Sequence, residues 1–360
     1  MKPGRAIWAG AMSLPTIALA QSVTLYGVVD TGVEVLNHTG ANNSALVRMN
    51  NLSGTVPSRW GLRGTEDLGG GLKSAFVLES GFAPDSGVSN QAGRLFGRQA
   101  WVGLNGRWGQ LALGRQYTML FWATLDADML GPNTFGSSSL DSYLANPRAD
   151  NAISYKGTFG GVTLGATYSL GRDAAPAGAP CAGENPADRR ACREWSALIG
   201  YNTSAWGMAV AYDSLRGAAG AGAGLGSSGM KDDRLSLSGY ANIGKAKLGG
   251  GWIRRDNDAN PATPRSDLWY GGASYTVTPA FSVDAEVLFL RYHHSANKAW
   301  LYAARANYAL SRRTTVYGTA GFIDNGGHLA LSVSSGGTPA APPTAGGNQL
   351  GAMLGIKHIF

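Results

Sequence analysis

Beyond its first twenty residues, the sequence contains no run of about 18 consecutive apolar residues, the length that a transmembrane helix needs. Charged residues make up only 15% of the chain, and the mean hydropathy is −0.10. These features exclude an ordinary helical membrane protein, but they do not exclude a membrane. In a transmembrane β-barrel only every second residue of a strand is apolar, so no long hydrophobic run arises.

Reactive and metal-binding patterns are also missing from the sequence. The five histidines have no carboxylate or cysteine at ligand spacing, and there is neither a Gly-x-Ser-x-Gly nucleophile elbow nor a Gly-Lys-Ser/Thr phosphate loop. We therefore expect no catalytic residue, no metal site and no cofactor. The formal net charge of +7 could suit nucleic acid, but there is no basic tail or RNA-binding signature. We expect no nucleic-acid partner.

The N-terminus has the layout of a secretory signal peptide. Lys2 and Arg5 precede an apolar stretch that ends in the small residues of Ala18-Leu19-Ala20. We expect residues 1–20 to be removed and residues 21–360 to form a single barrel domain.

Cysteine is nearly absent, with Cys181 and Cys192 in a stretch rich in Pro, Ala and Gly. In an oxidising compartment we expect them to form a disulfide that pins a surface loop. A metal site at these residues lacks further ligands nearby.

Alternating segments along the chain are separated by connections that are in turn short and long. The short connections lie at residues 67–71, 105–109, 157–161, 203–207, 242–245, 278–280 and 310–313. The long connections lie at about residues 37–57, 83–94, 117–147, 171–194, 216–231, 256–265, 294–298 and 326–348. Seven turns and eight loops separate sixteen strands. An even number of strands suits an all-β, antiparallel transmembrane barrel with short periplasmic turns and long extracellular loops.

The two faces of such a wall are visible in residues 281–289, where apolar residues alternate with Asp284 and Glu286. Alternation alone also fits a secreted soluble β-protein. Aromatic residues near the ends of the segments, such as Trp300 and Tyr308, favour a wall that faces lipid.

Several arginines are expected to face the barrel interior. If Trp60 and Leu62 face lipid, then Arg59 and Arg63 face inward, because successive side chains of a strand alternate. Facing lipid near the midplane would cost about 2–4 kcal/mol for each arginine. For Arg63, which lies near a turn, a simple solvating role is the more economical interpretation.

The same reasoning applies to two further segments. With Trp101 outward, Arg98 and Ala100 are expected inside, and in the segment that follows the third loop Arg148 and Lys156 are expected inside. Polar barrel interiors are common, so the positions alone do not assign a role.

Five segments of the sequence are recognisable. They are SVTLYGVVD (22–30), SRWGLRGTEDLG (58–69), FGRQAWVGL (96–104), LGRQY (113–117) and GIKHIF (355–360). They resemble the Gram-negative general porins, particularly those of β-proteobacteria. The resemblance implies a homotrimer in the outer membrane, in contact with its lipids and lipopolysaccharide. It also implies a third loop folded into the pore and a C-terminal Phe360 read by the barrel assembly machinery.

The resemblance also assigns a pore constriction. It implies that a basic cluster lines the wall opposite the third loop, at the positions of Arg59, Arg98 and Arg148. The loop carries Asp126 and Asp128, and Asn133 stands where many general porins have a glutamate. With one acid fewer, we expect a passive, weakly anion-selective channel for small hydrophilic solutes rather than an enzyme. The alternative is a substrate-specific channel for phosphate or an organic anion.

Overall fold

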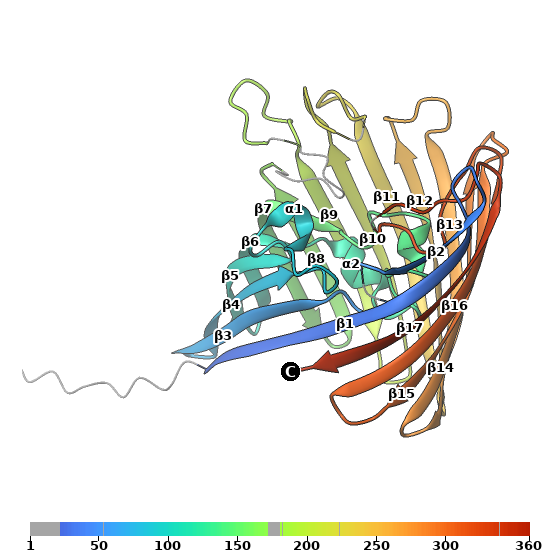
Figure 1. Ribbon diagram of the computed structural model, residues 1–360. Coiled ribbons are helices and arrows are strands. Elements are labelled where there is room, and N and C mark those ends of the chain that lie inside the picture. The colour runs from blue at the N-terminus through green and yellow to red at the C-terminus, as the bar shows by residue number, and fades with distance from the viewer. Residues whose placement is uncertain (1–21, 53, 172–180, 182, 223, 338) are drawn as a thin grey trace, which may run out of the picture.

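The computed structural model describes residues 22–360 except Ser53, residues 172–180, Ala182, Ala223 and Thr338 (Figure 1). The expected signal peptide, residues 1–20, lies outside the described residues and stays a prediction.

The described residues form one antiparallel sheet that closes on itself, with short helices in the loops. The strands are β1 (Ser22–Thr39), β2 (Ser44–Met49), β3 (Arg59–Gly69), β4 (Leu72–Gly81), β5 (Gln99–Gly106), β6 (Gly109–Tyr117), β7 (Arg148–Phe159), β8 (Val162–Ser169), β9 (Glu194–Asn202), β10 (Trp206–Arg216), β11 (Lys231–Ile243), β12 (Ala246–Asn257), β13 (Arg265–Thr278), β14 (Phe281–Tyr292), β15 (Lys298–Ala309), β16 (Thr314–Gly326) and β17 (Asn348–Ile359). The helices are α1 (Asn90–Gly93), α2 (Met119–Thr124) and the 3-10 helix η1 (Ser137–Ser139).

Strand β1 closes the barrel. One edge of β1 pairs with β17, while its other edge pairs with β3 along its first half and with β2 along its second half. At the closure, Gly27 and Phe360 exchange two backbone hydrogen bonds of 3.1 Å. Because β2 and β3 occupy one position in the wall, the barrel has the predicted sixteen positions, and the seven short turns lie where the sequence predicts them.

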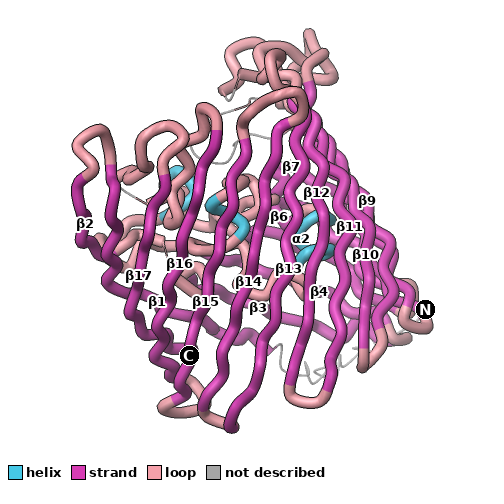
Figure 2. The backbone as a smooth tube through the Cα atoms, turned by 90° about the vertical axis from the view of Figure 1, so that its right-hand side faces the viewer, coloured by secondary structure: helices cyan, strands magenta, loops and turns pink. Residues whose placement is uncertain are grey.

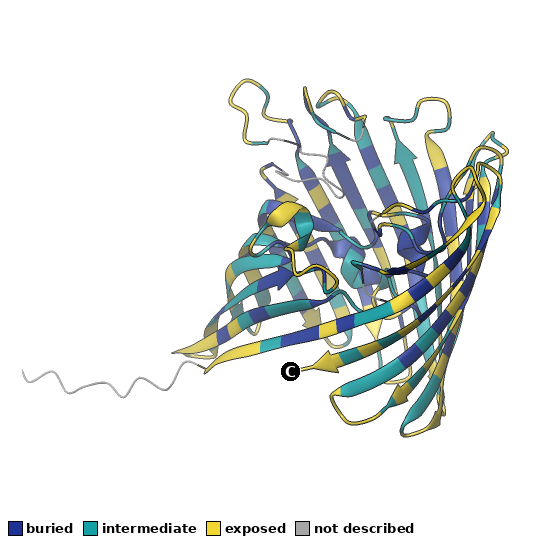
Figure 3. Ribbon diagram, in the orientation of Figure 1, coloured by how far each residue is buried: buried dark blue, intermediate teal, exposed yellow. Residues whose placement is uncertain are grey.

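The strands alternate between an inner and an outer face, which Figure 3 shows as stripes of buried and exposed residues. On β14, Asp284 and Glu286 are buried inside, whereas Val283 and Val287 are 37% and 41% exposed. This arrangement confirms the alternation expected for residues 281–289. Large apolar side chains therefore cover the outer wall, as a barrel in lipid requires. Among the described residues, no helix is long and apolar enough to span a membrane.

The first expected loop, residues 37–57, is partly strand. The chain turns at Gly40 and Asn43, both with positive φ, and returns as β2. Within β2, Arg48 is buried and pairs with Glu34 of β1, while Val47 is 65% exposed on the outer face. The alternation is thus present in the sequence, but it covers only six residues and is easily missed.

Two loops fold into the barrel, and Figure 2 shows helix α2 of the third loop inside the ring of strands. Met119, Leu120 and Phe135 of the third loop (residues 118–147) join the buried apolar cluster with residues of the wall. The eighth loop, which connects β16 to β17, follows it inward. Its Val333 carbonyl accepts hydrogen bonds from the Phe135 N–H at 3.0 Å and from the Ser139 hydroxyl at 2.9 Å.

Candidate functional site

Glu79 on β4 gathers charged side chains at the inner wall. Arg98 Nε lies 2.7 Å from Glu79 Oε1, and Arg59 Nε lies 3.5 Å from Glu79 Oε2. The Tyr26 hydroxyl donates a hydrogen bond to the same carboxylate at 2.9 Å. Arg63 lies beside this group, with its guanidinium 5.2 Å from the centre of the Tyr26 ring. One carboxylate therefore faces two guanidinium groups, which leaves a net positive charge.

Tyr117 connects this group to a third arginine. Its hydroxyl accepts hydrogen bonds from Arg98 Nη2 at 2.6 Å and from Arg148 Nη2 at 3.0 Å. The Arg148 guanidinium also lies 4.6 Å from the centre of the Tyr117 ring. The structure thus brings the three predicted arginines together. We call Arg59, Glu79, Arg98, Tyr117 and Arg148 the arginine cluster.

The three arginines differ in how far water reaches them. The Arg59 side chain is 28% exposed, whereas the Arg98 side chain is 6% exposed and residue Arg148 is 4% exposed. Arg59 therefore presents its charge to the lumen. The guanidinium groups of Arg98 and Arg148 are enclosed by their partners, so their charge acts on ions in the lumen from a greater distance.

Two neighbours of Arg98 are oriented opposite to our expectation. Val102 is 57% exposed on the outer face of β5, so Ala100 also points outward and Trp101 points inward. Arg98 reaches the lumenal side nevertheless. It precedes β5, which begins at Gln99, and strand alternation does not apply to it.

Asp213 on β10 anchors both ends of the third loop. Its carboxylate accepts hydrogen bonds from the Thr118 hydroxyl at 2.6 Å and from the Leu120 N–H at 3.3 Å. The Tyr143 hydroxyl, near the other end of the loop, donates to it at 2.9 Å. Asp213 is fully buried, so breaking these bonds would leave a carboxylate without partners away from water.

A salt bridge adds a further anchor to the loop. Arg234 Nε on β11 lies 2.9 Å from Asp141 Oδ2, and Arg234 is 1% exposed. Burial alone would raise the pKa of Asp141, but the Arg234 guanidinium outweighs it and lowers the pKa to about 2. Asp141 therefore stays ionised across the neutral range.

Asp128 and Asn133 do not face the arginine cluster, which corrects our expectation for the third loop. Both are 8% exposed. Asp128 accepts hydrogen bonds from the Gly131 N–H at 2.7 Å and the Ser137 hydroxyl at 2.6 Å, and burial raises its pKa. The Asn133 amide donates to the carbonyl of Thr55. Asp128 therefore satisfies polar groups of the third loop, and Asn133 satisfies a carbonyl of the segment between β2 and β3, instead of lining the water.

Glu286 on β14 holds the middle of the loop. Its two carboxylate oxygens accept hydrogen bonds from the N–H groups of Met129 at 3.3 Å and Leu130 at 3.1 Å. Glu286 is 2% exposed, so this contact is enclosed between loop and wall. The loop is thus fixed at its ends and at its centre.

Asp126 and Lys156 lie where water reaches the loop. The Asp126 side chain is 61% exposed and lies 3.2 Å from Lys247 Nζ on β12. Lys156 Nζ on β7 lies 3.3 Å from the centre of the Trp122 ring. The exposed acid of the loop is therefore compensated by a lysine, and Lys156 contributes further positive charge.

Sequence reasoning did not identify Glu79, Tyr117 or Asp213. For Glu79 a signal exists, because Phe76 and Leu78 alternate with it and predict that its charge points inward. The roles of Tyr117 and Asp213 depend on where the third loop lies, and loops carry no periodic pattern.

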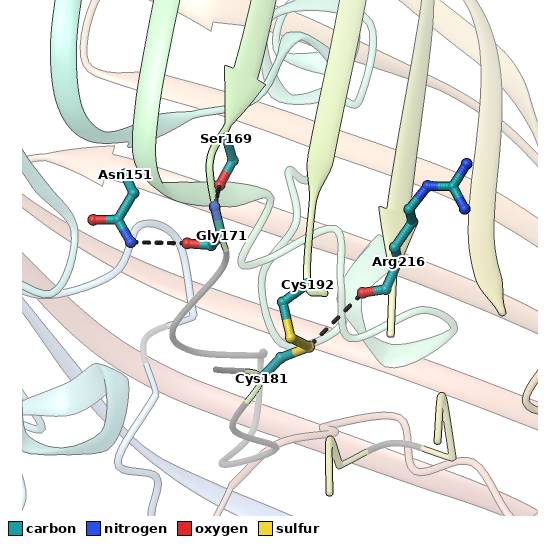
Figure 4. Close-up of a disulfide and its surroundings, with 6 residues drawn as sticks. All are labelled: Asn151, Ser169, Gly171, Cys181, Cys192 and Arg216. Carbon is teal, nitrogen blue, oxygen red and sulfur yellow. Dashed lines mark hydrogen bonds between the residues drawn. A yellow bond between two sulfur atoms is a disulfide. The ribbon is translucent and has the colours of Figure 1, made fainter. Parts of the chain in front are cut away.

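Figure 4 shows the disulfide between Cys181 and Cys192, next to Arg216 at the end of β10. The two Cα atoms are 5.5 Å apart, and both residues are buried. The Cys192 N–H donates to the Gly217 carbonyl at 3.0 Å. The bridge therefore closes a short ring within the fourth long loop, which leads into β9. The hydrogen bond to Gly217 holds this ring against the fifth long loop, which follows β10. Within the described part of the chain, no group of three or more His, Cys, Asp or Glu residues is arranged to hold a metal ion.

Comparison with known proteins shows what this chain is similar to. The sequence profile of the family described as Gram-negative porin matches residues 6–328. The chain is 31% identical to outer membrane porin protein 32 of Delftia acidovorans over 95% of each chain. It is 38% identical to an outer membrane porin protein of Bordetella pertussis over 41% of this chain and 43% of that protein.

Solved structures agree with this similarity. An anion-selective porin from Comamonas acidovorans superposes with a TM-score of 0.73 at 27% identity, covering 95% of this chain and 100% of that one. The OmpT outer membrane protein of Vibrio cholerae gives a TM-score of 0.65 at 14% identity, covering 97% and 100%. The latter likeness shows the shared fold.

Proposed function

This chain belongs to the Gram-negative porin family, and from this premise we propose that its outer-membrane barrel is a weakly anion-selective channel whose selectivity is set by the arginine cluster. Solutes cross such a barrel by passive diffusion through water. The carrying observation is that the arginine cluster holds three guanidinium groups but one carboxylate: Arg59 and Arg98 pair with Glu79, and Arg148 binds the Tyr117 hydroxyl. The cluster therefore keeps about two uncompensated positive charges, because guanidinium stays protonated at any relevant pH.

The polar residues expected in the third loop do not cancel this charge. Asp126 is paired with Lys247, Asp128 is turned into the loop, and Asn133 is neutral. A positive wall in a narrow aqueous passage raises the local concentration of anions and lowers that of cations. We propose that Arg59, as the exposed member, meets the passing ion first.

The assembly is also part of the proposal. We infer a homotrimer, as the family membership implies, embedded in outer-membrane lipid and lipopolysaccharide and inserted by the barrel assembly machinery. We assign the chain no enzymatic activity. Light scattering of the purified protein, corrected for detergent, should give three times the mass of one chain, whereas a monomeric mass would overturn the inferred assembly.

Single-channel conductance in three salts tests the selectivity. Replacing potassium by the slower lithium should change the conductance little, whereas replacing chloride by the slower acetate should lower it clearly, because anions carry most of the current. The opposite pattern would overturn the proposal. Saturable block by phosphate or an organic anion at low concentration would instead identify a substrate-specific channel.

A further inference from the structure

A recess lies between helix α2 and the inner face of the wall. Trp122 and Ala123 of α2 form its roof, and it encloses a volume of about 150 Å³. Its floor contains Gly200 of β9 and Ala209 of β10, which are register partners and carry almost no side chain. The helix therefore covers this part of the wall without filling the space beneath it. None of the residues of the arginine cluster lines the recess, so the two sites are distinct.

Lys156 of β7 brings a positive charge into this recess. Its Nζ lies 3.3 Å from the centre of the Trp122 ring, and the residue is half-buried. Within the described residues, no carboxylate pairs with Lys156 and no oxygen accepts a hydrogen bond from it. An aromatic face attracts a cation but does not neutralise it. The ammonium group therefore keeps N–H groups for an anion that enters the recess.

The Trp122 ring is fixed before any ligand arrives. It meets the Phe121 ring edge-on, with centroids 5.3 Å apart, and Phe121 stacks on Tyr117 at 3.9 Å. The start of α2 is bound to the wall through Asp213, as described above. A site whose walls are already in place loses little conformational entropy on binding.

The far side of the recess adds no uncompensated charge. Lys247 Nζ lies 4.7 Å from the centre of the Tyr240 ring, but it also lies 3.2 Å from Asp126 Oδ1. The Tyr240 hydroxyl donates a hydrogen bond to Asn202 Oδ1 at 3.3 Å. Behind the floor, Leu198 of β9 is 7% exposed and gives the recess an apolar back. One unpaired cation beside an apolar surface calls for a ligand with one negative charge and an apolar body.

We infer that the recess binds an aromatic monocarboxylate such as benzoate, with its carboxylate on Lys156 and its ring over Gly200 and Ala209. A cavity of about 150 Å³ is large enough for one benzene ring. The carboxylate accepts charge-assisted hydrogen bonds from the ammonium group. The ring removes the apolar back of the recess from water. This binding site goes beyond the proposed channel function, and it does not depend on whether chloride or potassium is the more permeant ion.

Equilibrium dialysis of the full-length protein in detergent, with radiolabelled benzoate, tests the inference. Wild type should bind one benzoate per chain in a saturable way. Lys156→Gln should bind benzoate about tenfold more weakly, which corresponds to about 1.4 kcal/mol, near the low end for a hydrogen bond to a charged group. The matched control is Arg63→Gln, which removes an exposed lumenal cation outside the recess and should bind benzoate as wild type does. An equal loss in both variants would mean that the positive lumen merely concentrates benzoate, and would overturn the site.

A second variant fills the recess and leaves every charge in place. A Cβ atom at Gly200 would lie 3.2 Å from the Met208 carbonyl oxygen and 3.5 Å from Ala209 Cβ, so the wall accepts a side chain there with a small shift. Gly200→Val should therefore weaken benzoate binding at least as much as Lys156→Gln does. An unchanged affinity would show that benzoate binds elsewhere.

Two further ligands test the inference on the wild-type protein, so it stays testable if a variant fails to fold. Benzamide has the shape of benzoate without its charge and should bind about tenfold more weakly. Acetate has the charge without the ring and should also bind more weakly than benzoate. If benzamide bound as tightly as benzoate, the contact with Lys156 would be wrong. If acetate did so, the contact of the ring with the floor would be wrong.

Discussion

Replacing Arg59 with Gln should lower the preference of the channel for anions. Arg59 is the arginine of the cluster whose side chain water reaches, at 28% exposed, while Arg98 and Arg148 are enclosed by Glu79 and Tyr117. Its ion-pair partner is Glu79 at 3.5 Å, and Glu79 keeps the closer Arg98 at 2.7 Å. The substitution therefore removes one lumenal charge and leaves the remaining hydrogen bonds of the cluster in place.

The size of the effect follows from Coulomb's law. An ion passing about 8 Å from the guanidinium in water interacts with it by about 0.5 kcal/mol. Chloride loses this attraction and potassium loses an equal repulsion, so the permeability ratio of chloride to potassium should fall about fivefold. The effect should shrink in concentrated salt, where the Debye length is shorter.

The assay is the zero-current potential of the channel in a planar bilayer under a KCl gradient. Arg107→Gln is the matched control, because it removes the same charge from an exposed position in the short turn between β5 and β6, away from the lumenal wall. Its potential should stay near that of wild type. The reasoning would be refuted by an unchanged potential in the Arg59 variant, or by an equal shift in the control.

Three further predictions concern the loops. Glu286→Ala should leave two buried N–H groups of the third loop without an acceptor, at about 1–3 kcal/mol each, and single-channel recordings should show a noisier open current than wild type. Asp141→Asn should lower the melting temperature at pH 7. Because the Asp141 pKa is lowered to about 2, this difference should persist above the unfolded pKa of about 4 and vanish as the pH falls through about 2. Replacing Cys181 and Cys192 with Ser should make the fourth loop more sensitive to protease, since the bridge contributes about 2–3 kcal/mol, while conductance stays unchanged.

The wall of the barrel could be predicted because its physics is periodic. The apolar positions around Asp284 and Glu286 repeat at every second residue, and lipid on one side with water on the other makes that repeat obligatory. The same alternation placed Arg59 on the lumenal side, because Trp60 and Leu62 were expected to face lipid. The rule fails at Arg98, which precedes β5, and the assumption that Trp101 faces lipid was wrong, because Trp101 lies within β5 and points inward.

The interior of the third loop could not be read in this way. Asp128 and Asn133 are polar residues in a long connection, and nothing in their local sequence distinguishes a side chain that lines water from one that satisfies the loop backbone. Their orientation depends on distant partners, Thr55 for Asn133 and Glu286 for Asp128, which only the closed barrel brings near. The one acid within the arginine cluster, Glu79, lies instead on strand β4.

The zero-current potential of the wild-type protein in a planar bilayer, with KCl more concentrated on one side, tests the proposed selectivity most directly. A sign that shows chloride to be more permeant than potassium is expected, because Arg59, Arg98 and Arg148 outnumber the single carboxylate among them. A potential of the opposite sign would contradict the assignment of the arginine cluster as the element that selects ions.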